Sequence, residues 1–209
     1  MRRKMNGVLL DEKKILDYCG SFRTGVSEED LPSEYTLPDH LIPDVRDQKT
    51  INSCVGFAIT NVMQILEQEE TGNRKQFSPG YVYGKCRADN AKYEGMYINL
   101  ALDYLMKEGS CFWEDFPYNE EMPKIREMVN NRPDLEEKAR PYKIKGYETY
   151  AQGDIKLKTL AIKKSIYENQ RPIVVAADFP GGSHAVCIIG WNDATQKWKI
   201  VNSWGKTYG

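Results

Sequence analysis

The 209-residue sequence has few of the residues that build metal sites and disulfide frameworks. It contains two histidines and five cysteines, and the cysteines are odd in number, widely spaced and without a Cys-x-x-Cys pair. Structural zinc sites and disulfide-stapled secreted domains both depend on such spacings. The sequence therefore predicts no metal, no cofactor and no disulfide framework, and it favours a reduced, cytosolic setting.

Long apolar runs and an excess of one charge are also missing. No segment approaches the roughly 20 apolar residues of a membrane span. The N-terminus offers only Val8-Leu9-Leu10 before charged residues interrupt, which is too short for the apolar core of a secretory signal, about 7 to 15 residues. Lys and Arg number 29 against 30 for Asp and Glu, so no overall field favours nucleic acid or an anionic membrane. We expect a cytoplasmic protein with neither partner, unless it leaves the cell by a route that its sequence does not display.

The remaining composition is that of a folded protein. Its 41% hydrophobic and 28% charged residues are ordinary for a globular chain. Residues 1–30 are strongly charged and are interpreted as an N-terminal extension or arm. Residues 31–49 carry three prolines, which favours an extended segment on the surface. The rest divides into a helical half over about residues 50–140 and an antiparallel β half over about 141–209.

Hydrophobic periodicity predicts the elements of each half. We expect helices from Cys54 to a stop at Gly72, over about 97–108 and over 154–169, the last capped by Asp154. We expect a buried strand over 172–177 and two more strands over 183–191 and 198–204. Asn52 or Ser53 can cap the first helix. The charged, proline-broken segment 114–140 is interpreted as a crossing between the halves. The predicted fold class is α+β.

The last two predicted strands form a hairpin centred near Asp193. Paired residue numbers then sum to about 386 to 388, so His184 lies opposite or nearly opposite Asn202. A general-base imidazole needs its far nitrogen held by a partner that fixes its tautomer and orientation. The Asn202 amide oxygen can accept that N–H. His184 and Asn202 are therefore predicted to be a base and its orienting group.

Cys54 opens the first predicted helix. A thiol there lies at the positive end of the helix dipole, which favours thiolate and can lower its pKa into the range of roughly 3.5 to 7.5 when a protonated histidine is also near. The backbone N–H of Cys54 has no partner within the helix. The side-chain amide of Gln48, six residues upstream, can supply a second donor. Together the two donors predict an oxyanion hole for acyl transfer.

These residues stand in a pattern that resembles the papain family of cysteine peptidases. The pattern comprises Asp47-Gln48 to Phe57-Ala58, then Ser183-His184-Ala185-Val186 and Val201-Asn202-Ser203-Trp204-Gly205. The order Gln, Cys, His, Asn and the 130 residues from Cys54 to His184 both match the family. The resemblance covers about residues 31–209, and intervening segments such as Phe116-Pro117-Tyr118 are closest to bacterial or phage members.

The resemblance implies a papain-like fold of two subdomains with the active site in the cleft between them. Cys54 would attack the scissile carbonyl, His184 would protonate the leaving amine and activate water, and Asn202 would hold His184. Gln48 would donate to the oxyanion. The implied substrate-binding residues are Gly95, Met96, Gly182, Ala185 and Trp204, with Trp204 also shielding the contact between Asn202 and His184 from water. Peptide or protein substrates would bind between the halves.

The predicted function is hydrolysis of peptide bonds by a cysteine peptidase. Two alternatives use the same fold: a catalytically silent peptide-binding module and an acyltransferase that passes the acyl group to an amine. The presence of every required group weighs against the silent module. A transferase would need water to be excluded, on which the sequence is silent.

The C-terminus of the peptidase domain, residues 31–209, is expected to be truncated. Papain-like chains usually continue into a further strand after the segment that here ends at Gly209, so we expect the natural chain to extend. An unpaired sheet edge at this point would favour self-association.

Overall fold

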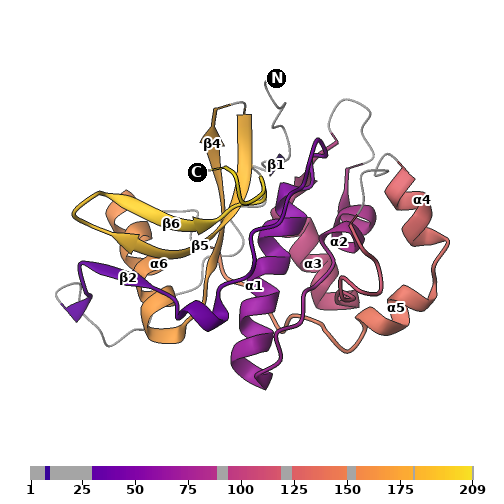
Figure 1. The fold of residues 1–209 in the computed structure, drawn as a ribbon, viewed down its shortest axis with the longest axis horizontal. Coiled ribbons are helices and arrows are strands. Elements are labelled where there is room, and N and C mark those ends of the chain that lie inside the picture. The colour runs from indigo at the N-terminus through magenta and orange to yellow at the C-terminus, as the bar shows by residue number, and fades with distance from the viewer. Residues whose placement is uncertain are drawn as a thin grey trace.

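The structure is a computed structural model of the chain and describes residues 8–9, 30–88, 94–118, 124–149, 154–180 and 182–208. The ribbon has two sides (Figure 1): helices α1 to α5 lie on one, and an antiparallel sheet with helix α6 lies on the other. Helices and sheet occupy separate layers, so the α+β class predicted from the sequence is confirmed. Among the described residues, no helix combines the length and apolar character needed to cross a membrane.

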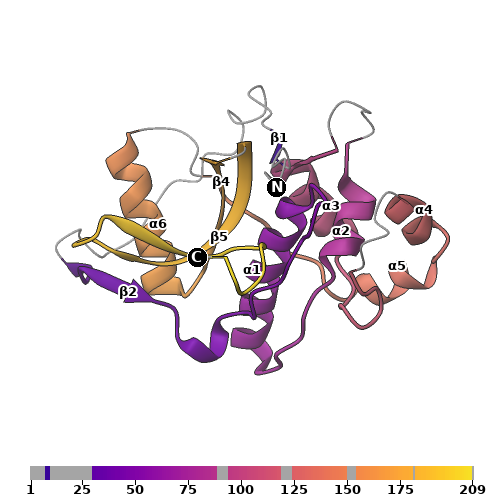
Figure 2. The ribbon, with the colours of Figure 1, turned by 45° about the horizontal axis from the view of Figure 1, so that its top comes forward.

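Helix α1, Cys54–Thr71, lies between the two sides. Figures 1 and 2 both place it between strand β5 and the other helices of its side. Apolar side chains are buried on more than one face of it, because Ile59 packs in the helical core and Ile65 in the core of the sheet side. The helix ends as predicted at Gly72, whose φ of 75° is the left-handed conformation that glycine adopts without strain.

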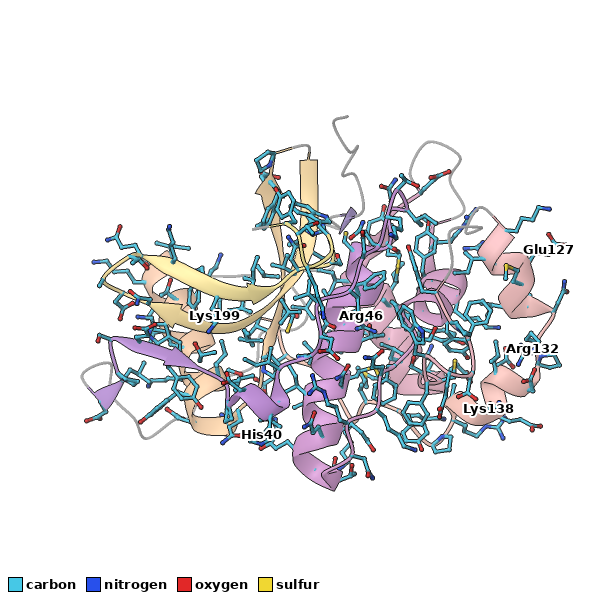
Figure 3. The ribbon with its side chains drawn as sticks, in the orientation of Figure 1. His40, Arg46, Glu127, Arg132, Lys138 and Lys199 are labelled. Atoms are coloured by element: carbon cyan, nitrogen blue, oxygen red, sulfur yellow. The ribbon has the colours of Figure 1, made fainter. Side chains whose placement is uncertain are left out.

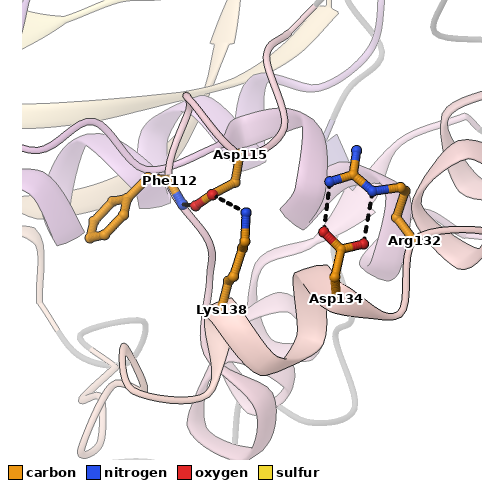
Figure 4. Close-up of polar contacts among 5 residues, drawn as sticks. All are labelled: Phe112, Asp115, Arg132, Asp134 and Lys138. Carbon is orange, nitrogen blue, oxygen red and sulfur yellow. Dashed lines mark hydrogen bonds and ion pairs between the residues drawn. The ribbon is translucent and has the colours of Figure 1, made fainter.

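The helical side is completed by α2 (Pro79–Cys86), α3 (Ile98–Glu108), α4 (Ile125–Asn130) and α5 (Asp134–Ala139). The interpretation of 114–140 as a mere crossing was wrong for its second part, because α4 and α5 each bury two apolar side chains one helical turn apart. Polar contacts fix this region (Figure 4): Lys138 Nζ lies 2.6 Å from Asp115 Oδ1, and Arg132 binds Asp134 through two nitrogens.

The sheet side contains β2 (Glu34–Thr36), β4 (Ile173–Phe179), β5 (Gly182–Asn192) and β6 (Lys197–Val201), with α6 (Ile155–Asn169) packed against it. Strand β5 is the centre, pairing antiparallel with each of the other three. As predicted, the Asp154 side chain caps α6, accepting from the backbone N–H of Lys156 at 2.6 Å. Strand β4 was predicted to be buried, but its residues are half-buried or exposed.

The segment before α1 is not a simple surface strand. It contains β2 and a 3-10 turn, Asp39–Leu41, and Leu37 and Leu41 are buried in the sheet-side core. It then runs along α1 (Figure 3), where Arg46 donates to Asn61 Oδ1 at 2.6 Å and the His40 carbonyl accepts from Gln68. These contacts fix the start of the loop that carries Gln48.

A second, two-stranded sheet joins distant parts of the chain. Strand β1 (Val8–Leu9) pairs in parallel with β3 (Met96–Tyr97), which directly precedes α3. This pairing brings part of the predicted N-terminal arm against a segment that the sequence assigns to substrate binding.

Candidate active site

His184 and Asn202 meet at the end of the β5–β6 hairpin. His184 Nε2 lies 2.8 Å from Asn202 Oδ1, which also accepts from the backbone N–H of Ser203 at 2.7 Å. An amide oxygen only accepts, so Nε2 carries the hydrogen and Nδ1 is left for proton transfer. The predicted contact is present, although not as a rung of sheet, because the register shifts after Ile188 and β6 ends at Val201.

Aromatic rings enclose the imidazole. Trp204 stacks on His184 with ring centroids 4.3 Å apart, and Phe179 meets it edge-on at 5.3 Å. His184 is therefore 1% exposed, and burial lowers its pKa, while the hydrogen bond to Asn202 opposes that shift. Trp204 lies where its predicted shielding role requires it.

Cys54 is the first residue of α1 and is completely buried. Burial raises the pKa of its thiol to about 11, and hydrogen bonds from the backbone of Ala185 and Val55 offset part of this rise. Burial therefore raises the pKa of the Cys54 thiol, because desolvation of the thiolate outweighs the backbone donors. Ala185 follows His184 on β5, so the hydrogen bond from its backbone joins Cys54 to the strand that carries the imidazole.

Three further described cysteines differ from Cys54 in their surroundings. Burial raises the pKa of Cys86 and of Cys111 to about 12, and it also raises that of Cys187. All three pack in or against the apolar cores, as Cys54 also does. Cys54 is the one of the four whose sulfur receives backbone hydrogen bonds from the sheet across the boundary between the halves.

The Gln48 side chain has one orientation. Its Oε1 accepts from the Ser203 hydroxyl at 2.6 Å, and its Nε2 donates to the Ile51 carbonyl at 2.8 Å. A flipped amide would place two carbonyl oxygens together, which disfavours it. Nε2 carries two hydrogens, so one remains for an oxyanion. Ser203 thereby joins Gln48 to the loop that holds Asn202.

Ser53 occupies the N-cap position of α1, as expected, but makes no capping hydrogen bond. Its hydroxyl instead lies 2.7 Å from that of Tyr118, which also donates to the Gln48 carbonyl at 2.9 Å. Tyr118 belongs to the site, although the sequence assigned it no role beyond its place in a Phe-Pro-Tyr segment.

The other predicted substrate-binding residues lie on both halves. Gly95 precedes β3, and its carbonyl accepts from Ala88 at 3.1 Å. Met96 is fully buried in the helical core, so its backbone rather than its side chain can meet a peptide. Gly182 begins β5 with a φ of 128°, a conformation that favours glycine. Within the described part of the chain, no cluster of His, Cys, Asp and Glu could hold a metal ion.

The fold and the grouped thiol, imidazole and amides define an α+β protein with a candidate cysteine nucleophile between its halves. Residues 31–209 match the sequence profile of the "Papain family cysteine protease", and the chain therefore belongs to the papain family.

Known proteins resemble this chain at low sequence identity. The chain is 24% identical over 214 residues to "Cysteine endopeptidase RepA" of Oryza sativa subsp. japonica, covering 91% of this chain and 53% of that protein. It is 23% identical over 177 residues to "Cathepsin L 1" of Paramecium tetraurelia, covering 80% and 53%. The chain thus spans about half the length of these curated relatives. Xylellain of Xylella fastidiosa has a similar fold, with a TM-score of 0.79, 23% identity and coverage of 100% of this chain and 88% of xylellain.

Proposed function

We propose that this chain is a cysteine peptidase that hydrolyses peptide bonds through a thioester acyl-enzyme at Cys54. The observation that carries the proposal is the 2.8 Å hydrogen bond between His184 and Asn202, made one residue from the Ala185 backbone that contacts the Cys54 sulfur. This arrangement supplies a nucleophile, a base and an orienting group in one place.

In the proposed reaction His184 relays two protons, one from the thiol to the leaving amine and one from water to the departing sulfur. His184 Nδ1 takes the thiol proton as Cys54 Sγ bonds to the carbonyl carbon, and the oxyanion receives hydrogen bonds from the Cys54 N–H and Gln48 Nε2. The carbon–nitrogen bond then breaks as the imidazolium protonates the leaving amine. Water next attacks the thioester, giving its proton to His184, which returns it to the departing sulfur.

The proposed substrate is an extended peptide that binds between the halves, along Gly95, Met96 and Gly182. The pairing of β1 with Met96–Tyr97 supports this, because the backbone edge at β3 accepts an extended strand. We retain residues 1–30 as a separate arm, and we propose that the pattern is closest to bacterial or phage members of the family.

A reducing compartment is part of the proposal. The described cysteines Cys54, Cys86, Cys111 and Cys187 are all free thiols, which suits a cytoplasmic protein.

We also propose self-association through the sheet edge at β6. The proposal is supported by the pairing of β6, which among the described strands pairs with β5 alone.

One experiment distinguishes the peptidase from the acyltransferase and the silent binding module. Peptide mixtures are incubated with the protein, with and without added amines, and the products are identified by mass. We expect hydrolysis that Cys54→Ala and His184→Ala abolish and that Asn202→Ala reduces less. Acyl transfer to the amine in preference to water would identify a transferase, and binding without turnover would identify a silent module.

A further inference from the structure

The hydroxyl of Tyr118 joins two segments of the site that adjoin the nucleophile. It lies 2.9 Å from the backbone carbonyl of Gln48 and 2.7 Å from Ser53 Oγ. Ser53 precedes Cys54, and Gln48 carries the proposed oxyanion donor. One side chain from a distant loop therefore contacts both ends of the loop 48–53.

The direction of each hydrogen bond follows from the atoms present. A carbonyl oxygen only accepts, so the single hydrogen of Tyr118 goes to Gln48. Ser53 must then donate its own hydrogen to Tyr118 Oη. Burial raises the pKa of Tyr118 well above its usual value, so this hydroxyl remains protonated and acts as a donor at every pH at which the protein would work.

The Tyr118 ring is held so that its hydroxyl has one position. Phe57, on the first turn of α1, meets the ring edge-on with centroids 4.8 Å apart, and Trp113 lies on another side at 6.3 Å. A ring fixed by packing makes a hydrogen bond with little further loss of conformational freedom. The contact with Gln48 is therefore a rigid one.

The same contact keeps the helix N-terminus open. A serine at the N-cap normally accepts from the second or third N–H of its helix, but the Ser53 hydroxyl is held by Tyr118 and makes no such bond. The N–H of Val55, second in α1, contacts the Cys54 sulfur instead. The Ser53 side chain therefore does not bind the first-turn N–H groups.

We propose that Tyr118 is a positioning residue that holds Gln48 in register for stabilising the oxyanion. The inference rests on the proposed peptidase function. Tyr118 itself touches no reacting atom, so its effect passes through Gln48.

Tyr118→Phe is the direct test, because it keeps the ring and removes the hydroxyl. We expect kcat for a peptide substrate to fall about 10- to 100-fold with KM unchanged, since small misplacements of a catalytic donor have effects of this size. In a Gln48→Ala background the same substitution should change kcat less than about twofold, because the group through which it acts is gone.

Tyr104→Phe is the matched control. Tyr104 is also half-buried, and its hydroxyl lies 3.1 Å from that of the buried Tyr81, within the helical side. This variant loses a comparable hydrogen bond and should keep the parent kcat. Thermal unfolding of both variants measures how much stability each loses with its hydrogen bond. Rates are divided by the fraction of Cys54 that iodoacetamide titrates, so that only folded sites are counted.

Two results would overturn the inference: a kcat for Tyr118→Phe within twofold of the parent, or an equal loss in the parent and Gln48→Ala backgrounds. If the parent chain hydrolyses no peptide at all, the proposed function fails instead.

Discussion

Replacing His184 with glutamine should move the alkylation of Cys54 to much higher pH. Glutamine keeps a polar side chain of similar size and cannot take a proton. In the parent, transfer of the thiol proton to His184 creates an imidazolium beside the thiolate, and that positive charge lowers the pKa of Cys54. Without it, only the buried environment remains, in which the pKa of Cys54 is about 11.

The size of the effect follows from the charge that is lost. A unit charge that comes within about 4 Å of the thiolate is worth ~4 kcal/mol at an effective dielectric constant of 20, which corresponds to about 3 pKa units. Only the thiolate is alkylated. Below the pKa of His184, where the imidazole is charged, the rate should therefore fall about a thousandfold in His184→Gln, and the two rates should converge as the pH approaches the thiol's own pKa.

The assay is the second-order rate of iodoacetamide labelling from pH 5 to 10, with the labelled cysteine mapped by mass. His40→Gln is the control, because His40 is the other histidine and lies exposed in the 3-10 turn Asp39–Leu41. In the parent, Cys54 should be labelled near pH 6 far faster than Cys86, Cys111 or Cys187, which burial keeps as thiols.

Equal pH profiles for the parent and His184→Gln would refute the reasoning, since the imidazole would then have no influence on the thiol. Uniform labelling of all cysteines in the parent would do so as well.

Three further predictions concern single features of the site and fold. Gln48→Ala should lower kcat about 10²- to 10³-fold, the usual loss for one oxyanion donor, and a rise in KM alone would make the amide a ground-state contact. Removing residues 1–29 should lower KM for peptides, because β1 occupies the Met96–Tyr97 edge; an unchanged KM would count against that edge as a binding site. In thermal unfolding, Gly205→Ala should cost about 1–2 kcal/mol, because φ is 78° and the new Cβ would lie 3.2 Å from a carboxylate oxygen. Gly146→Ala, in open space, should cost almost nothing, and equal melting temperatures would contradict the backbone argument.

Features decided by nearby residues could be predicted from the sequence. Helix α1 runs from Cys54 to Thr71 because apolar periodicity and a glycine stop define it. The contact between His184 and Asn202 was predicted because both residues lie on one hairpin, although the observed register differs from the predicted rung. In both cases the information lies within about 20 residues of sequence, which is the range over which periodicity and turn signals act.

Features decided by distant residues could not be predicted. The prolines of residues 31–49 predicted a surface segment, but Leu37 is buried in the sheet-side core, which distant residues form. The pKa of Cys54 depends on burial and on a backbone hydrogen bond from Ala185 of β5, a residue far along the chain. The Ser53 hydroxyl was expected to cap α1, but Tyr118, 65 residues later, binds it instead.

Trapping the acyl-enzyme tests the central claim most directly. A peptide ester is mixed with the chain, the reaction is quenched in acid within the first turnover, and the intact mass and its proteolytic fragments are measured. The account predicts a mass increase equal to the acyl group, located on the fragment that contains Cys54 and absent in Cys54→Ala. Turnover of the ester with the acyl group on another residue, or undiminished turnover in Cys54→Ala, would contradict it.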